Sequence, residues 1–303
     1  MSETTPVIEL SGVTKRFGRF AAVDDVTLRV MPGEVVGFVG ANGAGKTTTI
    51  SMLLGFLNAT KGEVKLFGQG IRPQNAHKSH RRIGYAAGDM ELPASLTGKQ
   101  YLTFLNHQGK GTTPELKDEL MKRFSPQLGK KIHALSRGNK QKIALVSAFL
   151  RDPDLIVLDE PTSGLDPVMQ ETFLDMIRDA KAKGKTVFMS SHYLQEVMDV
   201  CDRVILMSGG RVVQDMDVAE LLAMGGKQVR LKSGYRPTKP PKGSESVETE
   251  FEDDLLTLSF VFKGDMGELQ RWLAGVKQLK DVEVSEYNLE EVFSELYKPE
   301  RTS

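Results

Sequence analysis

The chain has 303 residues, with 40 Lys plus Arg against 40 Asp plus Glu, so its formal net charge is zero. This length indicates one large domain with an appendage, or two domains, and the charge balance excludes a global attraction to nucleic acid or anionic membranes. The only cysteine, Cys201, excludes an internal disulfide framework and is typical of a reducing compartment; we interpret it as a small core side chain.

The N-terminal residues MSETTPVIEL have no basic segment followed by an apolar stretch, so no secretion signal is expected. No window approaches the roughly 18 uninterrupted apolar residues of a membrane-spanning helix. We therefore expect a cytosolic protein, which can serve a membrane process only by docking.

The first elements in chain order are strands. Residues 7–30 contain two runs that alternate apolar and polar residues, which predicts an antiparallel sheet at the edge of the fold. A turn at 31–34 leads to VVGFV (35–39), a continuous apolar run typical of a strand that is covered on both faces. Similar apolar runs follow later at LIVLD (155–159), TVFMS (186–190) and RVILM (203–207). Helical segments lie before or between these runs. This pattern predicts an α/β core with a parallel sheet.

Helical signals fill the middle of the chain. Residues from about 89 to 153 favour a helical insertion, and Thr97 and Gln100 have the spacing of a capping box. A later helix is expected to begin at Asp166, with Pro167 in its first position and Gly184 at its end.

The composition changes after Leu231 to KSGYRPTKPPKGSESVE, which indicates a loop or linker. We expect a first domain over 1–228, a strand and Pro/Gly-rich linker over 229–248, and a small α+β accessory domain over 249–303. The expected elements of this last domain are a strand at 255–262, a helix at 267–276, a strand at 281–287 and a helix at 289–296.

The segment GANGAGKTT (40–48) follows the buried strand and opens an apolar helix, the context of a phosphate-binding loop. Its glycines Gly40, Gly43 and Gly45 let backbone N–H groups turn toward phosphates, and the helix start adds positive potential. Lys46 would neutralise β- and γ-phosphate charge, and the Thr47 hydroxyl would coordinate Mg²⁺. The remaining expected nucleotide contacts are Asn42, Ala44 and Thr48. The sequence thus predicts binding of ATP or GTP.

Two further strand ends carry polar residues. Asp159 ends a buried strand, where it can hold Mg²⁺ through a water, and Glu160 beside it can orient or deprotonate an attacking water. His192 follows the strand at 186–190 and can contact the γ-phosphate or that water. Because consecutive parallel strands deliver their ends to one edge, these side chains are expected together.

These motifs, in this order, resemble the ATP-binding cassette (ABC) family of ATPases over residues 1–220. The resemblance rests on the phosphate loop, the signature LSRGNKQK (135–142), the segment LIVLDEP, the D-loop SGLD (163–166) and the switch histidine His192. It implies an ATPase fold with two cassettes facing head to tail. ATP then lies between one phosphate loop and the partner's signature, which supplies Ser136, Arg137, Gly138 and Asn139, while Asp166 connects the two sites.

The residues of the signature segment also favour anion binding when they are considered without the family. Ser136 can cap a helix over 137–150, whose start offers N–H groups to an anion. Gly138 keeps the backbone close to that anion, and Arg137 adds positive charge. In the family an aromatic residue stacks on adenine; Phe17 occupies that place, and Phe20 is the alternative.

Two departures from the family pattern stand out. Where the family places a glutamine after the IGY strand, this chain has Gly88 or Asp89, and Asp89 could take the metal-side role. The second departure is the pair Arg137 and Asn139 in the signature, which leaves Ser136 and Gly138 in place.

The single cassette resembles ATPases of bacterial exporters whose permease is a separate chain. We therefore expect a MgATP-dependent dimer, with a homodimer favoured, that drives export of a drug, antibiotic, peptide, lipid or polysaccharide from the inner face of the membrane, with no nucleic-acid partner. The alternative is a soluble ABC ATPase that remodels a non-membrane assembly. A silent scaffold is disfavoured because Glu160 and His192 are both present. The apolar stripe Leu289, Val292, Phe293 and Leu296 predicts a helix that packs its own domain, and the basic run at 78–82 a solvated face.

Overall fold

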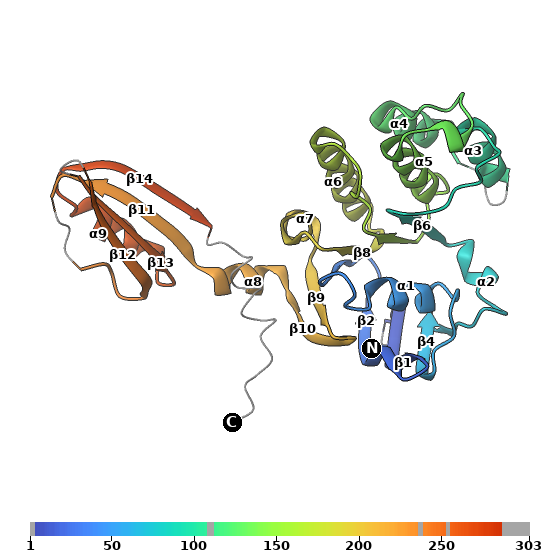
Figure 1. Ribbon diagram of the computed structural model, residues 1–303, viewed down its shortest axis with the longest axis horizontal. Coiled ribbons are helices and arrows are strands. Elements are labelled where there is room, and N and C mark those ends of the chain that lie inside the picture. Colours follow the sequence, from blue (N-terminus) through green and yellow to red (C-terminus); the bar gives the residue numbers. More distant parts are fainter. Residues whose placement is uncertain (1–3, 108–111, 236–238, 253–254, 287–303) are drawn as a thin grey trace. The chain divides into compact units, whose positions relative to one another are not determined.

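In the computed structural model, which describes residues 4–107, 112–235, 239–252 and 255–286, the chain divides into two units, residues 1–216 and 217–303 (Figure 1). The division lies earlier than the expected end of the first domain at 228. The reason is a strand at 227–233 that pairs within the sheet of the second unit.

A six-stranded sheet forms the centre of the first unit. In spatial order its strands are β10 (Arg211–Asp217), β9 (Arg203–Ser208), β3 (Val35–Val39), β8 (Thr186–Ser191), β7 (Leu155–Asp159) and β6 (Ile83–Ala87). The pairings of β9, β3, β8, β7 and β6 are parallel, and every residue of β3, β7 and β8 is buried. The prediction of an α/β core with a parallel sheet is confirmed.

A second, antiparallel sheet forms the edge of this unit, as the alternating runs predict. Its order is β2 (Phe20–Val30), β1 (Ile8–Phe17), β4 (Lys61–Leu66) and β5 (Gln69–Gly70). The apolar positions of β1 and β2 point to one face, so Val13 pairs with Val26 and both are fully buried.

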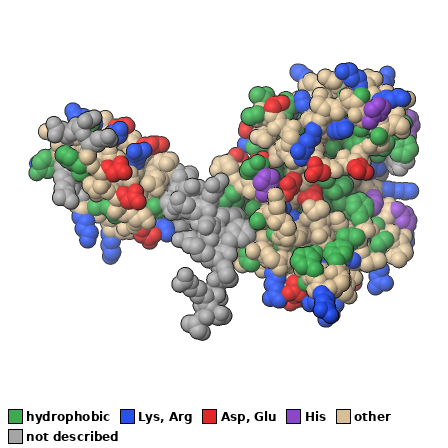
Figure 2. Space-filling view, in the orientation of Figure 1, with side chains coloured by type: hydrophobic (Ala, Val, Ile, Leu, Met, Phe, Trp, Pro, Cys, Tyr) green, Lys and Arg blue, Asp and Glu red, His purple; other side chains and the backbone are tan. Residues whose placement is uncertain are grey.

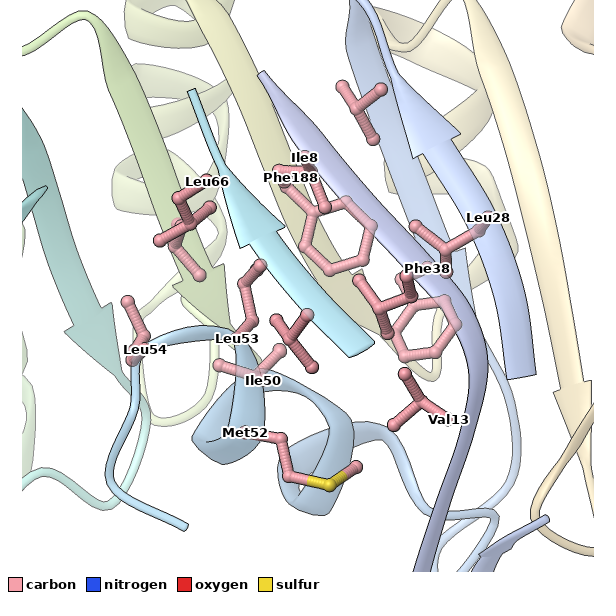
Figure 3. Close-up of a cluster of buried hydrophobic side chains, with 14 of the residues drawn as sticks. Ile8, Val13, Leu28, Phe38, Ile50, Met52, Leu53, Leu54, Leu66 and Phe188 are labelled. Carbon is pink, nitrogen blue, oxygen red and sulfur yellow. The ribbon is translucent and has the colours of Figure 1, made fainter. Parts of the chain in front are cut away.

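Helix α1 (Lys46–Leu53) packs between the two sheets. Figure 3 shows Ile50, Met52 and Leu53 of α1 among side chains of the edge sheet and the parallel sheet. Phe38 and Phe188, from neighbouring strands, contact each other with ring centroids 5.2 Å apart. The start of α1 is therefore held in place by a core on both sides.

Helices α5, α6 and α7 cover the opposite face of the parallel sheet (Figure 1). Besides α1, the helices described in this unit are α2 (His77–His80), α3 (Gly98–His107), α4 (Pro114–Phe124), the 3-10 turn η1 (Ile132–Ala134), α5 (Arg137–Phe149), α6 (Pro167–Ala182) and α7 (Leu194–Val200). The capping box is present, because Thr97 N donates to Gln100 Oε1 and Gln100 N donates to Thr97 Oγ1. Helix α6 begins as expected: the Asp166 carboxylate accepts from Met169 N at 3.0 Å, with Pro167 in the first position.

The second unit is a four-stranded antiparallel sheet with one helix on it. It contains α8 (Val218–Gly225), β11 (Lys227–Ser233), β12 (Ser244–Glu252), β13 (Leu255–Phe262), α9 (Met266–Ala274) and β14 (Leu279–Glu286), with sheet order β12-β13-β11-β14. Leu269 and Trp272 of α9 pack on the central strands. Strand β12 begins inside the segment expected as linker, and the helix expected at 289–296 lies outside the described residues.

No helix within the described ranges is both long and apolar enough to cross a membrane. Figure 2 shows basic and acidic side chains interspersed over the visible face of each unit, which agrees with the net charge of zero.

Candidate active site

The carboxyl ends of β3, β8 and β7 meet at one edge of the parallel sheet, since these strands are neighbours in the order β3-β8-β7. Strand β3 leads into the loop at 40–45, β7 ends at Asp159, and His192 directly follows β8. The side chains predicted from three distant parts of the sequence are thereby delivered to the same place.

The loop at 40–45 turns sharply into α1. Gly45 has φ +107°, and a Cβ there would lie 2.4 Å from the Ala22 carbonyl oxygen, so only glycine fits. Helix α1 has no side-chain cap and no acidic residue in its first turn. Its first N–H groups therefore present positive potential to an anion, as a phosphate site requires.

Lys46 lies at this helix start with its side chain only 4% exposed. Its Nζ donates to the Gly40 carbonyl oxygen at 2.6 Å and contacts Glu160 Oε1 at 3.3 Å. A buried ammonium group needs such oxygen partners, and phosphate oxygens are of the same kind.

Glu160 lies between two candidate site residues. Its Oε1 contacts Lys46, and its Oε2 lies 3.3 Å from His192 Nδ1. The backbone of Glu160 has φ +51°, an unusual conformation for a residue with a side chain, and its N–H donates to Ser190 Oγ at 3.0 Å. The turn after β7 therefore aims this carboxylate into the site.

Asp159 is 5% exposed and accepts a hydrogen bond of 2.5 Å from Ser190 Oγ. Burial, and secondarily the charge of Asp159, raises the pKa of Tyr85 on the neighbouring strand to about 12, so this phenol stays neutral. The described residues hold no group of three or more His, Cys, Asp or Glu side chains that could bind a metal by itself. The oxygen donors Thr47 and Asp159 fit a Mg²⁺ ion that arrives with phosphates, since Mg²⁺ keeps few protein ligands.

The signature segment starts helix α5. Ser136 Oγ accepts from Asn139 N at 3.4 Å and from Asn139 Nδ2 at 3.2 Å. The predicted cap is thus present, although the backbone bond is long. Arg137 Nη2 donates to Asp89 Oδ1 at 2.9 Å and to Ser163 Oγ at 2.8 Å. The hydrogen bonds of residues 136–139 thus lead to other parts of the same helical region and to the loop after β7, not to residues 40–48.

Phe17 and Phe20 form a cross-strand pair at the end of the β1–β2 hairpin and are 51% and 67% exposed. Lys15 Nζ lies 5.1 Å from the centroid of the Phe17 ring. Both rings offer an open face for stacking on a nucleobase. Asp166, exposed at the start of α6, caps its own helix.

Sequence reasoning missed three supporting residues. Ser190 positions both Asp159 and the Glu160 backbone. Gln141, only 3% exposed, donates through Nε2 to the Pro161 carbonyl oxygen at 2.6 Å and so ties α5 to the loop after β7. Glu196 accepts from Ser191 Oγ at 2.9 Å and hydrogen-bonds Thr162. A polar residue at a core-facing position was the available signal for Ser190 and Gln141.

Burial is the main cause that raises the pKa of the Glu196 carboxyl, against the hydrogen bonds from Thr162 and Ser191. Replacing Glu196 with Ala leaves these two hydroxyls, which are 3% and 2% exposed, without their acceptor. We expect Glu196→Ala to lower the free energy of unfolding by about 1–3 kcal/mol.

Urea denaturation measures this loss, and Gln195→Ala on the exposed side of α7 is the matched control, expected within about 0.5 kcal/mol of the parent. Because the folded pKa is raised, the stability that Glu196 contributes is complete below its ordinary value of 4.5 and is lost as the pH rises through the folded pKa. The deficit of Glu196→Ala should thus be larger at about pH 5 than at about pH 8. Equal stability of Glu196→Ala and Gln195→Ala contradicts this role.

Residues 23–163 match a protein family described as ABC transporter. The chain is 35% identical over 217 residues to the uncharacterized ABC transporter ATP-binding protein YhcH of Bacillus subtilis (strain 168), covering 71% of each chain. It is 32% identical over 215 residues to Nod factor export ATP-binding protein I of Burkholderia pseudomallei (strain 1710b), covering 69% of this chain and 70% of that one. A solved structure of the ATP binding subunit of an ABC transporter is similar with a TM-score of 0.65 and 27% identity, over 72% of this chain and 92% of that chain.

Proposed function

The chain belongs to the family of ABC transporter ATP-binding proteins, and from this premise we propose that it binds and hydrolyses MgATP as one of two cassettes that drive a separate membrane permease. The observation that carries the proposal is the Glu160 carboxylate, which lies 3.3 Å from both Lys46 Nζ and His192 Nδ1. This arrangement supports the proposal, because it brings a carboxylate, an ammonium group and an imidazole ring together beside the phosphate loop.

Each residue then has a task in hydrolysis. Lys46 and the start of α1 bind the phosphates, and Glu160 orients the attacking water and accepts its proton. His192 donates a hydrogen bond to the γ-phosphate or to that water. Thr47 and Asp159 would hold Mg²⁺, which supplies charge neutralisation at the β- and γ-phosphates when bound. Phe17, or Phe20 beside it, would stack on adenine.

Half of the site is proposed to come from a second copy of the chain. Ser136 and Gly138 open α5, a helix start suited to an anion, yet the contacts of this segment do not lead to residues 40–48 of the same chain. In a head-to-tail pair, each signature segment would face the partner's nucleotide. Asp166, exposed at the start of α6, would contact the partner across the same interface.

The permease contact is proposed at a groove of about 170 Å³ between the core of the first unit and α3. Phe56, 56% exposed, lies at this groove with its ring 5.9 Å from those of His80 and Tyr85, and Tyr101 and Leu105 line the α3 side. An aromatic side chain as exposed as Phe56, beside a partly apolar groove, fits a short helix of a membrane protein.

Co-purification with membranes tests the transport role. The chain should sediment with membranes only when a cognate permease is expressed with it, and Phe56→Ser should weaken this association by about tenfold or more. Phe251→Ser, at a residue 72% exposed in the second unit, is the matched control. Association with a non-membrane complex instead would favour the alternative, a soluble ABC ATPase that remodels an assembly. Export as the direction of transport is supported by the name of the Nod factor relative.

A further inference from the structure

Arg137 joins three segments of the first unit that each carry a candidate site residue. Its Nη2 donates to Asp89 Oδ1 at 2.9 Å and to Ser163 Oγ at 2.8 Å. Asp89 follows β6, Arg137 opens the signature helix α5, and Ser163 lies in the loop between Glu160 and Asp166. One guanidinium group therefore connects the signature to the loop of the candidate base.

The loop that follows β6 and the loop that follows β7 are also packed closely against each other. A Cβ on Gly88 would lie 2.6 Å from the Glu160 carbonyl oxygen and 2.9 Å from Ser163 Cβ, so a residue with a side chain does not fit there. The polar side chain of this loop is instead found one residue later, on Asp89. There it meets Arg137, so the two departures from the family pattern are partners in one ion pair.

The stem of Arg137 contacts the same loop. A Cβ on Gly164 would lie 3.2 Å from Arg137 Cδ, and a Cβ on Gly138 would lie 3.1 Å from the Gly164 carbonyl oxygen. The start of α5 thus rests directly on residues 163–164. The planar, permanently charged fork of arginine can address a carboxylate and a hydroxyl at once, which a lysine ammonium does with less directional precision.

Stability is not the main consequence of this contact. The Arg137 and Asp89 side chains are 60% and 89% exposed, and exposed ion pairs contribute little to the free energy of folding. Its consequence is geometric, because together with the packing of Gly138 and Gly164 it favours one position of the signature relative to the loop that carries Glu160 and Asp166.

We propose that Arg137 is a positioning residue: paired with Asp89, it holds the start of α5 against the loop at 160–166, so that signature and catalytic loop approach the partner chain as one rigid part. The proposal rests on the proposed function, a dimeric ATPase. It assigns Arg137 a partner within its own chain, in place of the contact with the partner's phosphate that the sequence suggested.

A double-mutant cycle with charge reversal tests the pair, using steady-state ATPase assays of the full chain. Arg137→Gln and Asp89→Asn should each lower kcat by about fivefold, with little change in the KM for ATP. The double variant should be no worse than either single one, because both remove the same contact. Arg137→Glu combined with Asp89→Arg should recover at least half of the lost kcat. Arg29→Gln, an arginine 67% exposed and paired with Glu9 at 3.0 Å, is the matched control.

The outcomes separate this role from the others. If Asp89→Asn keeps the parent kcat while Arg137→Gln does not, Arg137 acts elsewhere, such as on the partner's nucleotide, and the proposal is overturned. Multiplying effects in the double variant, or no recovery on charge reversal, overturn it as well. An inactive parent chain that equals Glu160→Gln would instead refute the proposed ATPase function, whatever the Arg137 series shows. Urea midpoints equal to that of the parent establish that the variants are folded.

Discussion

Glu160→Gln is expected to lower the rate of ATP hydrolysis by about 10²–10⁴-fold while nucleotide binding persists. The amide keeps the size of the side chain and its place between Lys46 and His192, but it cannot accept a proton from water. The negative charge that contacts Lys46 at 3.3 Å is also removed, so the affinity for ATP should stay equal or rise. Phosphate release and the binding of a fluorescent ATP analogue measure the two effects separately.

Glu171→Gln is the control for this experiment, because Glu171 has a side chain 60% exposed on α6 and forms its ion pair with Arg178, away from the candidate site. It should leave hydrolysis unchanged. If Glu160→Gln keeps more than half of the parent rate of hydrolysis, Glu160 is not the base. Loss of ATP binding in the same variant would instead indicate a structural role for the carboxylate in the phosphate loop.

Gly138→Val is expected to have the second large effect, a loss of hydrolysis of about 10²-fold with normal ATP binding by the single chain. A Cβ at 138 would lie 3.1 Å from the Gly164 carbonyl oxygen, so the branched side chain of valine would force the helix start away from residue 164 and disturb the backbone proposed to face a partner's nucleotide. Gly129→Val is the matched control in the same helical region, since a Cβ there meets nothing within 4 Å.

Mixing two inactive variants tests whether the site is shared between chains. In a head-to-tail dimer, Lys46→Gln disables one phosphate loop and Gly138→Val on the other chain disables the signature that faces it. The second site of that mixed dimer then has an intact Lys46 and an intact Gly138, so hydrolysis should reappear on mixing. Mixed dimers that form and stay inactive would refute the shared site.

Local sequence patterns predicted most of the strands and helices of the first unit. Continuous apolar runs predicted β3, β7, β8 and β9 because strands covered on both faces need them, and Asp166 with Pro167 predicted the start of α6 because caps are local chemistry. The first residues of strand β12, 244–248, were assigned to the linker because the preceding Pro and Gly residues dominated the composition. The alternation of Val247, Thr249 and Phe251 with Glu248 and Glu250 was the available signal for this strand, and it was not used.

The candidate site was predicted as a set of residues, but its internal contacts were not. Strand order gave the shared edge for Lys46, Asp159, Glu160 and His192, whereas the bridging position of Glu160 depends on a backbone φ of +51° that no sequence pattern specifies. The pairing of Asp89 with Arg137 could not be predicted from the sequence either, because it joins residues 48 positions apart through the packing of two loops.

Strand β11 determines where the chain can be cut. It lies inside its sheet, hydrogen-bonded to β13 on one side and to β14 on the other, and its Val229 and Leu231 are buried in the core of the second unit. A protein shortened at the division after Met216 would lose the second unit whole and keep the ATPase core. One that ends at 228 would carry the first two residues of β11 without their sheet, and the separated remainder would lose the pairing of Lys227 and Gln228 with β13 and β14. A truncated first unit should therefore be more soluble when it ends near 216 than when it ends at 228, which size-exclusion chromatography of the two shortened proteins measures.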